Sequence, residues 1–210
     1  MNQTIHSKIK FCGMMSTDDC TAANEILPDY IGFVFAPGRK RTVSAEDAKA
    51  MKAVLSPEIR AVGVFVNETT DVVANLLNSN IIDIAQLHGD EDEAYIKELR
   101  TKTGGSIIQA IQYSKFTEDA AFLKAIRESS ADMVLIDSGT GCGKTFPWEV
   151  IQKTDRPYFL AGGLNPENVK EAILLLHPFA VDVSSGIETE HKKDKAKMAA
   201  FANAVRKEIL

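Results

Sequence analysis

The sequence has 210 residues, of which 45% are hydrophobic and 25% charged, and its formal net charge is −5. Such a chain can bury a large core and is most simply one domain over residues 1–210. Its acidic balance argues against a nucleic-acid partner, because binding a phosphate backbone relies on clustered Lys and Arg.

Short apolar runs rich in β-branched residues recur along the chain and predict strands. The eight runs cover residues 8–12, 30–35, 59–66, 82–87, 106–111, 132–137, 157–162 and 179–185. Segments with helical spacing lie between them and follow start signals such as Thr17-Asp18-Asp19, Ser44, Asn67 to Thr70, and Asn165-Pro166-Glu167. Strands that alternate with helices indicate right-handed βαβ units and a parallel sheet buried on both faces.

Eight such units predict an α/β fold, a single-domain (β/α)8 TIM barrel with short loops, for which about 200 residues is the lower limit. A doubly wound open sheet is the alternative, and it would place a nucleotide crevice near the first strand. That strand instead runs into FCGMMST, which contains neither GxGxxG nor GxxxxGK. The sequence therefore favours the barrel.

The stretch MVLIDSGTGCGKTFPW, residues 133–148, is a near-match to a nucleotide-binding P-loop. It leaves a nucleotide hydrolase open as an alternative function. A P-loop needs a glycine six positions before its lysine, where this chain has Ser138. Pro147 follows Lys144 by three residues, and proline fits the first position of a helix better than its interior. The pattern favours a strand ending at Asp137, a loop over 138–146 and a short helix from Pro147.

The three cysteines, Cys12, Cys20 and Cys142, show no CxxC or Cys/His spacing typical of a metal site. We therefore expect free thiols in a reducing compartment and no structural zinc. No apolar run approaches the roughly 20 residues needed to span a bilayer, and MNQTIHSKIK lacks the apolar region of a signal peptide. A cytoplasmic location without a membrane partner is expected.

The chemically capable residues follow the predicted strands, where a barrel of this kind builds its active site. Cys12 ends the first strand, Arg39 and Arg41 lie in the loop after the second, His88 follows the fourth, and Asp137 ends the sixth. Each alone has an ordinary structural explanation, as a buried thiol, a solvated basic turn, a rim histidine or a helix cap. Together they supply an acid, a base and a cation.

Glycine-rich turns follow the seventh and eighth strands, in the segments AGGLN and DVSSG. One such turn often serves only to close a βα connection. The pair on adjacent strands predicts a phosphate site, because backbone N–H groups bind phosphate at this position in such barrels. The whole set suits proton transfer on a sugar phosphate that carries a second anionic group.

Segments along essentially the whole chain resemble phosphoribosylanthranilate isomerase of tryptophan biosynthesis. In order, they are KFCGM, GFVFAPGRKRTVS, VGVFVN, IAQLHGDE, LIDSGTGCGKTFPW, LAGGLNPENV and VDVSSGIE followed by HKKDKAKM. The resemblance implies an Amadori rearrangement of N-(5-phosphoribosyl)anthranilate to 1-(2-carboxyphenylamino)-1-deoxyribulose 5-phosphate, without cofactor or metal. It places the GKT in the loop after the sixth strand, where its likeness to a P-loop would be coincidental. A catalytically silent phosphate-binding barrel is a third alternative, although both Cys12 and Asp137 are present.

The resemblance also implies a role for each matching residue. Asp137 matches the general acid that protonates the furanose oxygen, Cys12 the general base that removes the C2 proton, and Arg41 the cation that holds the anthranilate carboxylate. His88 matches a rim histidine whose role is not fixed. The phosphate cradle matches Gly162, Gly163, Ser184, Ser185 and Gly186. The expected partner is a small phosphorylated aminosugar, and both a monomer and a homodimer are compatible with the sequence.

The pKa of the acid and the pKa of the base must be shifted in opposite directions. A carboxylic acid that donates a proton near neutral pH needs a raised pKa, so we expect desolvation or the substrate's charges to raise that of Asp137. A thiol base must lose its proton, so we expect a cation or a positive dipole to lower the pKa of Cys12 below about 8.5.

Overall fold

The computed structural model describes residues 7–137 and 148–207. The loop predicted over 138–146 lies outside these residues, as do Cys142, Lys144 and Pro147 of the P-loop-like stretch.

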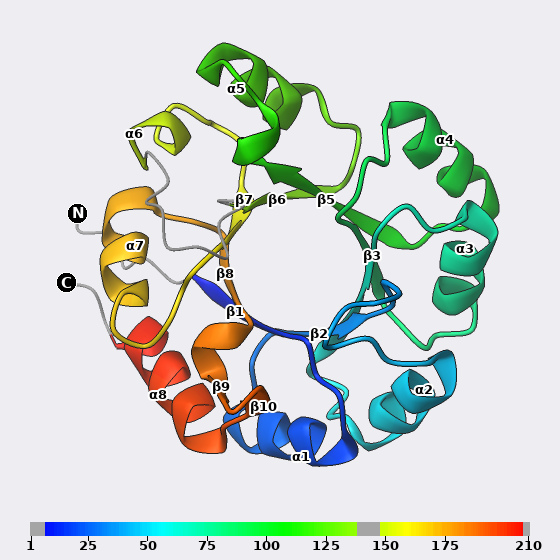
Figure 1. Cartoon of the computed structure of the whole chain (residues 1–210), viewed down its shortest axis with the longest axis vertical. Helices are drawn as coiled ribbons and strands as arrows, with labels where there is room; N and C mark the ends of the chain where they lie inside the picture. Colours follow the sequence, from blue (N-terminus) through cyan, green and yellow to red (C-terminus); the bar gives the residue numbers. More distant parts are fainter. Residues whose placement is uncertain (1–6, 138–147, 208–210) are drawn as a thin grey trace.

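Eight parallel strands close into a barrel in which β8 pairs with β1, and the helices surround it (Figure 1). The strands are β1 Lys8–Cys12, β2 Tyr30–Val34, β3 Arg60–Phe65, β4 Ile84–Leu87, β5 Ser106–Gln112, β6 Met133–Asp137, β7 Tyr158–Ala161 and β8 Ala180–Val183. Each predicted run contains one of them or overlaps it. The predicted (β/α)8 barrel is therefore confirmed, and the open-sheet alternative is wrong.

A helix follows each of the eight strands. The helices are α1 Thr17–Ile26, α2 Ala45–Val54, α3 Thr70–Asn78, α4 Glu93–Lys102, α5 Asp119–Glu128, α6 Trp148–Ile151, α7 Val169–Leu176 and α8 Lys195–Arg206. Within the described residues no helix is both long and apolar enough to cross a bilayer.

Capping residues determine where several helices begin. Ser44 forms a reciprocal capping box with Asp47 at the start of α2, as its start signal predicted. The signal at 165–167 lies a little before its helix, because the Asn165 side chain accepts hydrogen bonds from the backbone N–H groups of Glu167 and Asn168. That turn delays the first residue of α7 to Val169.

The core has two parts because side chains alternate across each strand. Residues facing outward, such as Ile9 and Phe11, pack under the helices. The barrel interior holds a smaller apolar cluster that includes Tyr30, Ile108 and Phe159. Buried polar side chains such as Lys10 and Asp182 also occupy inward positions. The apolar cluster fills the interior, and the polar positions lead to the carboxyl ends of the strands.

A short hairpin between β8 and α8 was not predicted. It pairs β9 Glu188–Thr189 with β10 Lys192–Lys193, so that Lys193 lies directly opposite Glu188. The two turn residues, Glu190 and His191, have φ of 51° and 64°. A turn of this kind usually contains Asn and Gly, and their absence explains why the sequence gives no hairpin signal.

Candidate active site

A pocket of about 530 Å³ lies at the carboxyl end of the barrel. Each strand contributes one lining residue: Cys12, Val34, Val64, Gln86, Gln112, Asp137, Ala161 and Asp182. The loops after the strands add Ala36, Arg39, Arg41, Val66, His88, Gly162, Gly163, Leu164, Ser184 and Ser185. The structure thus brings together all the predicted site residues except Gly186, which is not part of this lining.

Cys12 is positioned by the register of the first two strands. It pairs with Gly32 of β2, where an added Cβ would lie only 2.8 Å from the Cys12 sulfur. A glycine at this position therefore leaves room for the thiol. Lys10 lies two residues earlier on the same inward side, and its Nζ is 3.0 Å from Asp182 Oδ1 across the β1–β8 pair. This buried ion pair lies beside Cys12.

The protonation of Cys12 reflects burial opposed by nearby charges. Burial raises the pKa of Cys12, and Asp182 raises it further, while the charges of Lys10 and Lys193 and a hydrogen bond from Lys10 lower it. The net direction is upward. The lowered pKa expected from the sequence is therefore wrong for this structure: the expected cations are present, but desolvation outweighs them.

Arg41 reaches the pocket across the backbone of Gly13. An added Cβ at Gly13 would lie 2.4 Å from Arg41 Cδ, and Gly13 also has a φ of +79°, so both space and conformation require glycine here. Beyond Gly13, Arg41 Nε and one terminal nitrogen each donate to a different oxygen of Glu188 at 2.7 Å. This bidentate pair fixes the plane of the guanidinium at the pocket.

Glu188 also accepts a 2.7 Å hydrogen bond from Lys193. Burial alone would raise the pKa of Glu188, but the hydrogen bonds and charges of Arg41 and Lys193 lower it to about 2. The Glu188 carboxylate is therefore ionised near neutral pH. It carries one negative charge between two cations.

Asp137 lies at the end of β6 and faces His88 across the pocket. His88 Nε2 is 3.2 Å from Asp137 Oδ2, and His88 Nδ1 is 2.9 Å from the Gln86 amide nitrogen. The Gln86 amide and the Asp137 carboxyl group thus hold the imidazole at its two ring nitrogens. The histidine with no assigned role thus orients Asp137. The raised pKa expected for Asp137 stays a prediction.

The two glycine-rich turns differ in what their glycines do. Gly162 and Gly163 have φ of 102° and 67°, and no atom lies within 4 Å of a Cβ added at Gly163, so bare backbone faces the pocket there. At Gly186 an added Cβ would lie 2.0 Å from the Leu164 carbonyl oxygen. Gly186 therefore allows the two turns to pack together, which holds Ser184 and Ser185 beside Gly163.

Sequence reasoning did not identify the charged residues around Cys12 as part of the site. Lys10 did offer a signal, because a lysine at the centre of a short buried strand is rare unless it is paired. Glu188 and Lys193 gave none, since their hairpin lacks turn residues. In the described part of the chain, no three His, Cys, Asp or Glu side chains are grouped so that they could hold a metal ion.

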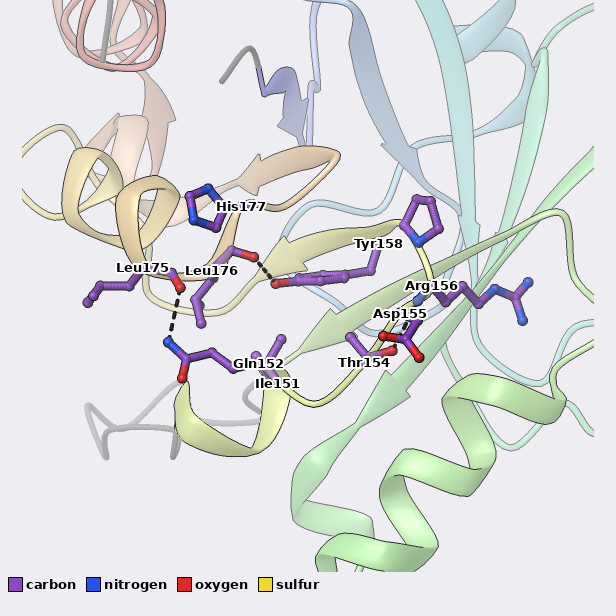
Figure 2. Close-up of a pocket in the computed structure, with 10 residues that line it drawn as sticks. Ile151, Gln152, Thr154, Asp155, Arg156, Tyr158, Leu175, Leu176 and His177 are labelled. Carbon is purple, nitrogen blue, oxygen red and sulfur yellow. Dashed lines mark hydrogen bonds between the residues drawn. The ribbon is translucent and has the colours of Figure 1, made fainter. Parts of the chain in front are cut away.

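A second pocket, of about 570 Å³, lies at the amino end of the barrel around the connections into β7 and β8 (Figure 2). Three of its polar side chains donate to backbone carbonyls. The Tyr158 hydroxyl donates to Leu176, the Gln152 amide to Leu175, and Arg156 to Ile126 and Ser129. These donors serve to join turns together.

Residues 9–204 match the family model described as N-(5'-phosphoribosyl)anthranilate (PRA) isomerase. The protein named N-(5'-phosphoribosyl)anthranilate isomerase from Thermoanaerobacter sp. (strain X514) is 41% identical over 206 residues, covering 95% of this chain and 98% of that protein.

Solved structures agree. The crystal structure of phosphoribosyl anthranilate isomerase from Thermotoga maritima has a TM-score of 0.85 at 34% identity, covering 95% of this chain and 98% of that one. A phosphoribosyl anthranilate isomerase in complex with reduced 1-(o-carboxyphenylamino)-1-deoxyribulose 5-phosphate has a TM-score of 0.82 at 32% identity, with the same coverage.

Proposed function

The chain belongs to the N-(5'-phosphoribosyl)anthranilate isomerase family, and from this premise we propose how its own residues carry out the reaction. The protein is an isomerase of tryptophan biosynthesis. It converts N-(5'-phosphoribosyl)anthranilate, an aminoaldose, into the aminoketose 1-(2-carboxyphenylamino)-1-deoxyribulose 5-phosphate. The rearrangement moves protons and electron pairs within one molecule, so acid and base groups suffice.

Asp137 is the proposed general acid for ring opening. Its carboxyl proton goes to the furanose ring oxygen, the bond from that oxygen to C1 breaks, and the anthranilate nitrogen lone pair forms the C1=N bond of a Schiff base. The contact of His88 with Oδ2 fixes the carboxyl group toward the pocket. A positioned acid of this kind accelerates proton transfer by about 10²–10⁴-fold.

Cys12 is the proposed general base for the next step. Its thiolate removes the C2 proton, the C2–H electron pair forms the C1=C2 bond, and the C1=N π pair returns to the anthranilate nitrogen. The resulting enolamine tautomerises to the C2 ketone. Cys12 and Asp137 line the same pocket from β1 and β6, which allows them to act on neighbouring positions of one sugar. The raised pKa of Cys12 keeps most of the free enzyme in the thiol form near neutral pH.

The two anionic groups of the substrate have separate binding sites in this proposal. Arg41 binds the anthranilate carboxylate with the donors that Glu188 does not occupy. The backbone at Gly162, Gly163, Ser184 and Ser185 binds the phosphate, and the positive φ at both glycines supports this, because such backbone exposes N–H groups to an anion. Gly186 contributes indirectly by holding the two turns together.

The alternatives from the sequence do not survive. A nucleotide hydrolase rested on the GKT at 143–145, and the family match includes these residues within 9–204. A silent phosphate-binding barrel has no support, because Cys12 and Asp137 both line the pocket. We infer a cytoplasmic enzyme whose partner is its small phosphorylated substrate.

The observation that carries the proposal is the placement of Cys12, Arg41, Asp137 and the two bare turns around one pocket in a chain of this family. The test is direct. Purified protein added to freshly generated phosphoribosylanthranilate should abolish its anthranilate-type fluorescence at a rate proportional to enzyme concentration. No loss above the spontaneous rate would refute the assignment.

A further inference from the structure

A buried lysine near Cys12 has no role in the mechanism above. The Lys193 side chain, on β10, is only 1% exposed. Its Nζ donates to Glu188 Oε1 at 2.7 Å and to the Ser184 carbonyl at 3.0 Å. The Glu188 side chain is 4% exposed and binds Arg41 through both oxygens. One carboxylate therefore joins two cations.

This arrangement leaves one positive charge uncompensated at the pocket wall. Burying an ammonium costs several kcal/mol unless it is paired, and Glu188 is shared between Lys193 and Arg41. On the other side of Cys12, Lys10 and Asp182 form a pair whose charges cancel. Four charged groups thus face Cys12: Lys10 from β1, Asp182 from β8, Lys193 from β10 and Arg41 from the loop after β2. The net charge of these four groups is positive.

We propose that Lys193 is a positioning residue of the isomerase, whose ammonium, held by Glu188 and the Ser184 carbonyl, supplies the positive charge that favours the thiolate of Cys12. The inference rests on the proposed role of Cys12 as the base. The hairpin β9–β10 places Lys193 opposite Glu188 and against Ser184. Ser184 in turn lies against the residue after Cys12, because its Oγ would be 3.1 Å from a Cβ added at Gly13.

The coupling between Lys193 and Cys12 is reciprocal. Lys193 lowers the pKa of Cys12 against the larger effect of burial. In turn, burial lowers the pKa of Lys193, while Glu188 and the charge of Cys12 raise it. Charge on one group therefore stabilises charge on the other, and a change at either must appear in the titration of its partner.

The first experiment removes the charge and keeps the hydrogen bonds. In Lys193→Gln the amide can still donate to Ser184 and Glu188. With Cys142→Ser as background and Cys20 buried, alkylation by iodoacetamide reports on Cys12. We expect the pH midpoint of alkylation to rise by about one unit and kcat at pH 7 to fall about tenfold, with KM changed less than about twofold. Lys192→Gln, an exposed neighbour on the same strand, should leave all three values unchanged.

The second experiment measures the same coupling from the other side and does not depend on the folding of Lys193→Gln. The ¹³Cε resonance of Lys193, assigned by its loss in Lys193→Arg, should titrate at lower pH in Cys12→Ser than in the wild type. The reason is that serine carries no charge to hold the ammonium proton.

The outcomes separate this inference from the proposed function. An unchanged alkylation midpoint in folded Lys193→Gln, or an unchanged Lys193 titration in Cys12→Ser, would overturn the role of Lys193 while wild-type turnover stands. If the midpoint shifts but the pH profile of kcat/KM does not follow it, then Cys12 is not the base, and the role of Lys193 in catalysis fails with it.

Discussion

The two ends of the barrel carry pockets of similar size, about 530 and 570 Å³, but they are built differently. At the carboxyl end, side chains distant in sequence bind each other, as Arg41 binds Glu188 and His88 binds Asp137. At the amino end, side-chain donors such as Gln152 and Tyr158 bind backbone carbonyls of nearby turns (Figure 2). The size of a cavity therefore does not distinguish a functional pocket from a gap between turns. What distinguishes them is whether the polar side chains bind one another or bind backbone carbonyls.

The strongest test of this contrast is to remove the proposed acid or base. Asp137→Asn and Cys12→Ser should each lower kcat by about 10²-fold or more, the scale of general acid–base contributions. Both residues lie at strand ends, so thermal unfolding should change little. The measurement is steady-state turnover together with a melting curve. Near wild-type turnover in either variant would show that its assigned role is wrong.

A second test uses pH to measure the ionisation of the Cys12 thiol. Because the pKa of Cys12 is raised in the free enzyme, its thiolate fraction should increase about tenfold per pH unit from neutral pH up to that pKa. We therefore expect the rate of Cys12 alkylation, measured in the Cys142→Ser background, to keep rising through pH 9, where a thiol with an ordinary pKa of about 8.5 would approach its plateau. An alkylation rate that levels off by pH 8.5 would contradict a raised pKa for Cys12.

A third test separates binding from chemistry within the carboxyl-end pocket. Arg41→Ala should raise KM by about tenfold or more with a smaller change in kcat, because the carboxylate it holds is remote from the reacting carbons. Arg39→Ala is the matched control in the same loop and should matter much less, although Arg39 also lines the pocket. Equal effects at the two positions would show that the substrate carboxylate is held elsewhere.

The barrel was predictable because its signals are local. Strand runs and helix caps such as Ser44 repeat around the chain, and the carboxyl ends of parallel strands must meet at one rim. That rule alone brings Cys12 and Asp137 together.

The electrostatic setting of the site could not be predicted in the same way. Arg41 and Glu188 lie 147 positions apart in the sequence, and the turn at Glu190 and His191 lacks the residues that announce a hairpin. The pKa of Cys12 depends on a balance between burial and the charges of Lys10 and Lys193. The direction of its shift depends on distances in the folded structure.

The smallest effect on activity is expected at the amino end. Arg156 donates to the carbonyls of Ile126, Ser129 and Ala131 and so ties the end of α5 to the start of β7. In Arg156→Met these carbonyls lose a charged donor, which should cost about 2–3 kcal/mol and lower Tm by roughly 4–10 °C. At a temperature where the variant is folded, kcat/KM should stay within about twofold of the wild type.

The control for this variant is Arg127→Met, at the exposed end of α5, where Arg127 makes no hydrogen bond to the described residues. Its stability should change by less than about 0.5 kcal/mol. A tenfold fall in kcat/KM for folded Arg156→Met, without a matching fall for Arg127→Met, would mean that the amino-end pocket is coupled to the reaction. Both pockets would then affect the reaction, to different extents. The hydrogen-bond partners of the polar side chains would no longer be enough to identify the active site.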